Sequence, residues 1–465
     1  MRKTLFRRDG AFYRRLWSLT LPIAAQNLIT FSLGLIDTFM VSQLGNDAMA
    51  AVTTANVPVF LLLSLVFGVQ SGLSILASQY WGRRDMESIS RAMGVACLVG
   101  LSLSAALATV FFLFPVQVMD LLTSEHALSV LGAPYLRIIG FSYVFNMLSS
   151  VYVSAQRSVE NPRFGMLVFG LSTVLNTLLN YILIFGHFGA PALGIEGAAL
   201  ATLLSRAAEF VICASVAVRS RRLPLHMRAF FHPGGEMLRR FIRYATPVMC
   251  NETLWGLGNS LLTVILGYTQ NAVAMLAAYS VTGNLGRLFL VVCFGLGAAT
   301  AVLVGKTIGE GAERREVLEL GKELLRFTTL VGVLLAIVSL ALVPLLFQPV
   351  LFPLFKLYGE TARIATALAV TAFATTPFHS YSISTIIGVL RAGGDVRWST
   401  ALDVMPQWLV ALPLTALTAL VWKGDVWILA LVIQMETFVK TPLCVWRVGS
   451  GKWIHDVTAA PRQDD

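Results

Sequence analysis

Asp37 is the residue whose type and surroundings most clearly allow chemistry. It is the only acid in the apolar stretch 16–44, and Gln26, Thr30 and Gly34 recur on its side of a helix. A carboxylate in hydrocarbon costs about 2.5–3.5 kcal/mol or more, so it is rare without a function. We therefore interpret Asp37 as a group that binds and releases a cation. The alternative is an aspartate paired in the core, although no base lies near it in the sequence.

A polar stripe in the stretch 164–186 could provide partners for such an acid. Asn176 and Asn180 are four residues apart, and Ser172 precedes them at the same spacing. Amide and hydroxyl oxygens can ligate a hard cation or hold a carboxylate. The alternative is that these neutral side chains only connect neighbouring helices by hydrogen bonds.

The second half of the chain carries its own acid in an apolar stretch, Glu252. It shares a helical stripe with Gly256 and Asn259, and we interpret it as a coupling or substrate-binding carboxylate. The alternative is an interfacial residue near the membrane edge. Four further polar residues in apolar stretches are candidates for a binding cavity, together with Gln26 and Asn259: Asn146, Asn284, Arg287 and His379.

The charged and titratable members of this set leave alternatives open. Arg287 shares a stripe with Asn284, and it could either repel cationic ligands or hold Glu252. We interpret His379 as a hydrogen-bonded core histidine, with a proton relay as the alternative. Helical spacing also predicts two ion pairs, Arg206 with Glu209 and Glu436 with Lys440.

The composition places these residues in membrane-spanning helices. The chain is 56% hydrophobic and 13% charged, which excludes an ordinary soluble protein of 465 residues. A spanning helix needs about 20 mostly apolar residues. The sequence therefore predicts an all-α membrane protein with twelve spans, at 16–44, 50–77, 91–114, 130–155, 164–186, 194–218, 240–267, 276–304, 324–348, 362–390, 399–421 and 426–446.

The distribution of charge predicts the orientation. Most of the 35 Lys and Arg residues fall in the N-terminal tail, in every second loop and in the C-terminal tail. Cytoplasmic loops carry such an excess, so we expect both termini in the cytoplasm and the protein in the cytoplasmic membrane. The net charge of +10 follows from this bias and does not indicate nucleic-acid binding.

The two halves of the chain resemble each other. Pairs of similar residues recur at nearly constant offset: Pro22 and Pro247, Gly68 and Gly295, Gly82 and Gly309, Arg157 and Arg391, and Asn161 and Asp395. Six spans in each half give both halves the same orientation, which is a parallel repeat about an axis along the membrane normal. We predict an N-terminal lobe at 1–218, a cytoplasmic linker at 219–238 and a C-terminal lobe at 239–465.

With these features, the chain resembles the multidrug and toxic compound extrusion (MATE) transporters of the NorM and DinF type. The likeness covers nearly the whole length. It depends on the spacing of Pro22 and Asp37, and on the segments QYWGRRD, NTLLNYILIFG, GIEGAALATLLSR and RAGGD, in that order. The resemblance implies two six-helix bundles arranged in a V around a central cavity. It also implies a secondary antiporter that exports amphipathic, mostly cationic organic compounds by alternating access, driven by H+ or Na+.

The resemblance further implies roles for single residues. Asp37 stands where the family places a cation-binding aspartate, and Asn176, Asn180 and Thr202 match the positions that join it. Some members carry a second aspartate where Asn180 stands, so the single carboxylate here favours H+ over Na+ as the coupling ion. A bound Na+ at these four residues stays the alternative, and we expect no other metal or cofactor.

The second lobe departs from the pattern of NorM-like relatives. Those relatives carry an aspartate in the tenth span, and Ser380 occupies that place here. The acid cluster of the second lobe is therefore incomplete.

An enzyme and a flippase are the two alternatives to a drug exporter. Motifs of metalloproteases, serine hydrolases and P-loop ATPases are absent from the sequence, so we expect no enzyme. A flippase for lipid-linked precursors, from the same superfamily, would place cations in its cavity, whereas this chain places acids there. We expect small organic substrates, contact with the lipid bilayer, no nucleic acid and a monomer.

Overall fold

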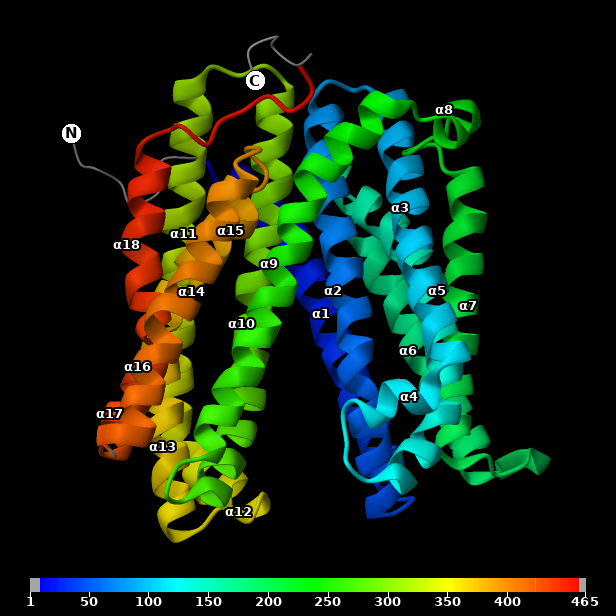
Figure 1. Cartoon of the computed structure of the whole chain (residues 1–465). Helices are drawn as coiled ribbons and strands as arrows, with labels where there is room; N and C mark the ends of the chain where they lie inside the picture. The colour runs from blue at the N-terminus through cyan, green and yellow to red at the C-terminus, as the bar shows by residue number, and fades with distance from the viewer. Residues whose placement is uncertain (1–8, 423, 460–465) are drawn as a thin grey trace. The chain divides into compact units, whose positions relative to one another are not determined.

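The computed structural model describes residues 9–422 and 424–459, and every regular element in these residues is helical (Figure 1). The first half contains α1 (Gly10–Ser42), α2 (Asn46–Gly82), α3 (Met86–Leu113), α4 (Pro115–Asp120), α5 (His126–Ser158), α6 (Pro162–Phe185), the 3-10 turn η1 (His187–Gly189), α7 (Gly194–Arg219) and α8 (Met227–Phe231). The second half contains α9 (Gly235–Gly267), α10 (Ala272–Gly309), α11 (Arg314–Leu342), α12 (Phe352–Leu354), α13 (Gly359–Ala374), α14 (Thr376–Ile383), α15 (Val396–Pro406), α16 (Leu412–Ala416), α17 (Val426–Ile433) and α18 (Met435–Gly449).

Wider π-helical segments continue several of the helices in the second half. They are η2 (Val343–Leu351), η3 (Ser384–Leu390), η4 (Gln407–Ala411) and η5 (Leu417–Trp422). Proline lies within or next to two of the four, Pro349 in η2 and Pro406 before η4. Because proline has no N–H to donate, the regular hydrogen-bond ladder is interrupted there and the helix adopts a wider turn.

Ten helical stretches among the described residues are long and apolar enough to cross a membrane. They coincide with ten of the twelve predicted spans, and the prediction of an all-α, multi-pass membrane protein is confirmed. The predicted span 240–267 is helix α9, in which Asn251, Glu252 and Asn259 lower the apolar character. The predicted span 362–390 is the run of α13, α14 and η3, which is interrupted at Thr375.

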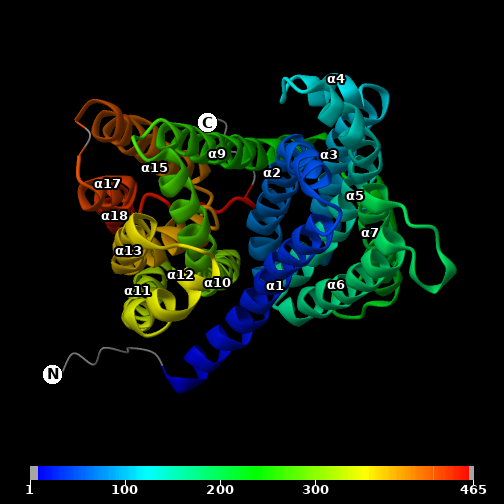
Figure 2. The same ribbon diagram turned by 90° about the horizontal axis from the view of Figure 1, so that it is seen from below.

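One compact unit extends from Ala25 to Met249. In this unit α5 packs against α2, α3 and α7, and α6 packs against α7. Figures 1 and 2 show these helices side by side from two directions. Leu62 and Leu136 are completely buried in its core. The end of α6 and the start of α7 approach closely at Gly197, where a Cβ atom would lie 2.5 Å from the carbonyl oxygen of Leu183.

The other compact unit comprises the first part of α1, up to Ala24, and the described residues from Cys250 onward. Here α10 packs against α13 and η3, and α11 packs against α14. Leu16 and Leu19 of α1 are buried in the same apolar cluster as Leu324 and Val389.

The boundaries of these two units therefore differ from the boundaries of the two lobes that the sequence repeat predicts. Each boundary lies inside a helix, in α1 after Ala24 and in α9 after Met249, shortly beyond Pro22 and Pro247. The first turns of α1 belong to the unit that contains the second half because they bury leucine side chains among its residues.

Candidate functional site

The first polar cluster lies in the unit Ala25–Met249 and contains the four predicted coupling residues. The side-chain amide of Asn180 donates to Asp37 Oδ1 at 2.6 Å and to Asn176 Oδ1 at 3.0 Å. Asn176 in turn donates to Thr202 Oγ1 at 3.2 Å. The structure thus brings together α1, α6 and α7 at these side chains, and both asparagines are fully buried.

Two further residues of α7 belong to this cluster: Ser205, which was missed in the sequence, and Arg206, which was predicted only as the partner of Glu209. Ser205 lies within 3.4 Å of the amide of Asn176. Arg206 pairs with the buried Glu209 at 2.7 Å, as its spacing predicted, and its positive charge also acts on Asp37. Ser205 follows Thr202 by three residues on one helix face, which is the signal that could have identified it.

Asp37 is held directly by a neutral amide, and the Arg206–Glu209 ion pair beside it carries one charge of each sign. Asp37 is partly buried and receives its hydrogen bond from an amide, not from a base. The other amide atom, Asn180 Oδ1, is buried and accepts no hydrogen bond from any residue that the structure describes. A buried acceptor without a donor raises the free energy of the folded state. A protonated Asp37 could supply the missing donor to Asn180 Oδ1.

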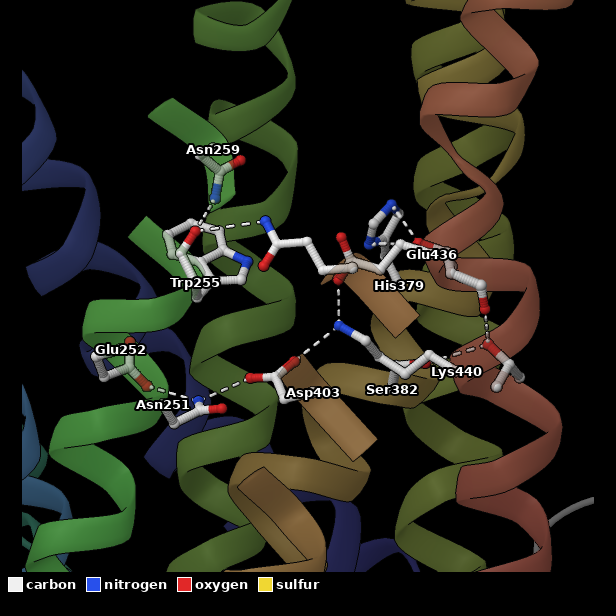
Figure 3. Close-up of polar contacts among 12 residues, drawn as sticks. Asn251, Glu252, Trp255, Asn259, His379, Ser382, Asp403, Glu436 and Lys440 are labelled. Atoms are coloured by element: carbon white, nitrogen blue, oxygen red, sulfur yellow. Dashed lines mark hydrogen bonds and ion pairs between the residues drawn. The ribbon is translucent and has the colours of Figure 1, made fainter. Parts of the chain in front are cut away.

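The second polar cluster lies in the other unit and is centred on Lys440 (Figure 3). Lys440 of α18 donates to Asp403 Oδ1 of α15 at 2.7 Å and also pairs with Glu436 one turn earlier, as its spacing predicted. Asn251 of α9 donates to Asp403 Oδ2 at 2.8 Å. Lys440 is only 6% exposed, so its charge is compensated by the two carboxylates and not by water.

Glu252 adjoins this cluster but is not a free carboxylate. Arg391, at the end of η3, donates to Glu252 Oε1 at 3.1 Å and is 1% exposed. Arg287, which was one possible partner for Glu252, lies on an exposed part of α10, as does Asn284. The base that holds Glu252 is therefore Arg391.

The charges of the second cluster do not cancel. Three carboxylates, Glu252, Asp403 and Glu436, face two bases, Arg391 and Lys440. One negative charge remains, which a proton, an inorganic cation or a cationic substrate could neutralise. The acids come from α9, α15 and α18, whereas the position in α14 that is acidic in NorM-like relatives is Ser380, which donates to the carbonyl oxygen of Thr328 at 2.7 Å.

The remaining predicted cavity residues do not join either cluster directly. His379 lies 3.2 Å from Gln434 Oε1 and 3.0 Å from Thr437 Oγ1, which fits the interpretation as a hydrogen-bonded core histidine. Asn259 donates to the carbonyl oxygen of Trp255 in its own helix.

Gln26 and Asn146 are buried in the unit Ala25–Met249. The side chain of Gln26 packs over Gly165 of α6, where a Cβ atom would lie 2.7 Å from Gln26 Oε1.

Comparison with known proteins identifies the family. The family model MatE matches residues 22–182 and 247–417, which is more than half of the chain, and the two matched segments begin at the prolines that the repeat aligned. The Bacillus subtilis (strain 168) protein named "Probable multidrug resistance protein YoeA" is 27% identical over 410 residues, covering 86% of each chain. The Bradyrhizobium diazoefficiens protein named "Probable multidrug resistance protein NorM" is 25% identical over 463 residues, covering 92% of this chain and 91% of that one.

Solved structures of the same fold agree with this assignment. A crystal structure of a MATE protein in the bent conformation matches with a TM-score of 0.82 at 20% identity, covering 95% of this chain and 97% of that chain. A mutant of the Vibrio cholerae MATE transporter VcmN matches with a TM-score of 0.82 at 19% identity, covering 95% and 96%. The doubled family match over most of the sequence and the shared helical fold together show that this chain belongs to the MATE family of membrane transporters.

Proposed function

We propose that this protein is an H+-driven antiporter that exports amphipathic, mostly cationic organic compounds by alternating access. The observation that carries the proposal is the carboxylate of Asp37, whose hydrogen-bond chain runs through the neutral side chains of Asn180, Asn176 and Thr202. One carboxylate can exchange one proton and become neutral, which lowers the cost of exposing it to hydrocarbon.

The partner of Asp37 favours a proton over Na+. Na+ would need several oxygens directed at one point, whereas Asn180 directs its N–H group at Asp37. Protonated Asp37 could donate to Asn180 Oδ1 after the amide turns over, so both protonation states would have a hydrogen-bonded arrangement. The second cluster supports cationic cargo, because its charges leave one negative charge uncompensated.

The test uses purified protein in proteoliposomes, with ethidium as the transported compound. A pH gradient at equal Na+ on both sides should drive uptake, and a Na+ gradient at equal pH should not. Asp37→Asn should abolish driven transport while the protein still folds and inserts. The control is Asp47→Asn, which removes an exposed acid at the start of α2 and should transport normally. Full activity of Asp37→Asn, or transport driven by Na+ alone, would overturn the proposal.

A second candidate function rests on one observation at Arg391. Its Nε and Nη1 atoms are buried and have no hydrogen-bond partner among the described residues, so they could receive an anionic group. A flippase for lipid-linked precursors would use such donors to hold phosphate. This candidate predicts that a lipid-linked diphosphate competes with ethidium, whereas the exporter proposal predicts no competition.

We also propose that the protein acts as a monomer in the cytoplasmic membrane, with both termini in the cytoplasm. The concentration of Lys and Arg in alternate loops supports the cytoplasmic position of the termini. Cysteine labelling of a variant with Ser450→Cys, in the turn after α18, should occur only from the cytoplasmic side of intact cells.

A further inference from the structure

An apolar cavity of about 480 Å³ lies in the unit Ala25–Met249, and none of the hydrogen-bonded residues of the Asp37 cluster lines it. It is bounded by α3, α5 and α7 and by the short helix α8 with its flanking residues. Its volume falls in the range of small-molecule sites, about 300–1,000 Å³. Residues that line it include Cys97, Leu101, Leu148, Phe210, Cys213 and Phe230.

Helix α8 packs against α3 (Figure 1). Gly94 of α3 permits the close approach, because a Cβ atom there would lie 2.0 Å from the carbonyl oxygen of Phe230. The backbone N–H of His226 donates to Ser90 Oγ at 3.2 Å, and Arg222 donates to the carbonyl oxygen of Glu160 at 2.9 Å. The connection between α7 and α9 is therefore docked on the bundle and forms one wall of the cavity.

Exposed arginines adjoin two of the lining residues in the sequence. Arg219 directly follows the lining residue Val218, and Arg228 directly follows the lining residue Met227. Both arginines are exposed, as is Arg221 between them, and residues 219–235 contain no acid. The charge pattern assigns this end of the helices to the cytoplasmic side, where anionic lipids attract such segments.

We propose that this cavity binds one acyl chain of an anionic phospholipid, with the phosphate among Arg219, Arg221 and Arg228. The lining residues Phe210 and Val218 are eight residues apart on α7, so the cavity extends about 12 Å along the helix at 1.5 Å per residue. That length accommodates much of an acyl chain.

The bilayer is the source of this ligand, because two apolar lining residues of the cavity at α8 are themselves exposed. Met227 is 45% exposed and Phe231 is 69% exposed, beside the exposed Arg228. An apolar face next to a basic residue is typical of a helix in the membrane interface. A lipid in the cavity would connect this segment to the cytoplasmic leaflet.

The test measures thermal unfolding of the purified full-length protein in a neutral detergent. Dioleoyl phosphatidylglycerol, dioleoyl phosphatidylcholine and inorganic phosphate are added separately. The phosphatidylglycerol should raise the unfolding midpoint by about 3 °C or more, because a ligand that binds only the folded state stabilises it. The phosphatidylcholine, which has the same chains, and phosphate alone should leave the midpoint within about 1 °C of the lipid-free value.

Two sets of variants distinguish the contribution of the cavity to lipid binding from the contribution of the arginines. Ala214→Phe fills the cavity and should remove the response to phosphatidylglycerol, whereas Val211→Phe adds the same group to a 60% exposed position on α7 outside the cavity and should keep it. Arg219→Gln and Arg228→Gln should each weaken lipid binding about fivefold. The matched control, Arg397→Gln, removes an exposed arginine elsewhere and should bind as the unaltered protein.

Three results would overturn the proposal. An equal response to both phospholipids would indicate unspecific solvation by lipid. A response that persists in Ala214→Phe would indicate binding of the headgroup at the surface only. An equal response to an uncharged apolar compound such as oleyl alcohol would indicate a general apolar pocket without selection for the anionic headgroup.

Discussion

Removal of the buried base at Lys440 should be among the most damaging single changes in this protein. Lys440 is 6% exposed and compensates Asp403, at 2.7 Å, and Glu436. Lys440→Met keeps much of the volume but leaves two carboxylates close together without a base. Breaking a buried ion pair by removing one partner typically costs about 3–5 kcal/mol.

The expected loss can be measured as a shift in thermal unfolding. At about 1 °C per kcal/mol for a chain of 465 residues, a loss of about 3–5 kcal/mol lowers the midpoint by about 3–5 °C. The matched control is Lys322→Met, because Lys322 forms a surface pair with Glu319 at 3.5 Å and its side chain is 37% exposed. Exposed pairs contribute about 0–1 kcal/mol, so this control should shift the midpoint by no more than about 1 °C.

A double variant tests whether charge is the cause. Lys440→Met combined with Asp403→Asn removes one charge of each sign and returns the cluster to the net charge that it has in the unaltered protein. Stability should therefore recover by at least about 1 kcal/mol relative to Lys440→Met alone. The reasoning is refuted if Lys440→Met unfolds at the same temperature as the unaltered protein, or if the double variant loses the sum of the two single losses.

Three other changes test the remaining parts of the structure. Asn180→Asp adds a second acid beside Asp37, and ethidium transport in proteoliposomes should become responsive to a Na+ gradient; transport indifferent to Na+ would contradict the role of Asn180. Glu252→Gln should reduce transport of cationic compounds more than that of neutral ones, as measured by competition with ethidium, and equal loss for both would assign Glu252 a coupling or structural role. Gly94→Ala should lower the unfolding midpoint, because the added methyl meets the backbone at Phe230 and overpacking costs about 1–3 kcal/mol; an unchanged midpoint would show that α8 moves freely.

Much of the fold could be predicted because the features that decide membrane insertion lie in short, continuous stretches of the sequence. Apolar stretches of spanning length and the placement of Lys and Arg depend on neighbouring residues only. The two predicted spans that deviate have local causes as well. Polar residues such as Glu252 lower the apolar character of α9, and the run 362–390 is interrupted at Thr375.

The candidate site was predictable only where partners share a helix or a repeated motif. Asp37 is conspicuous as an acid in an apolar stretch, and Asn176 with Asn180 form a stripe at helical spacing. The ion pair of Glu436 and Lys440 followed from the same rule. Asp403 was not recognised as the other partner of Lys440, because the two residues lie on different helices.

The sequence by itself therefore determined that the chain crosses the membrane repeatedly, that its halves are related, and that Asp37 is a candidate coupling residue. Tertiary structure alone decided that Arg391 holds Glu252, that Arg206 acts on Asp37, and that α8 closes an apolar cavity. The physical reason is that such contacts depend on the rotation and depth of each helix relative to its neighbours. Those quantities are set by the packing of side chains across whole helix faces, and no short stretch of the chain contains them.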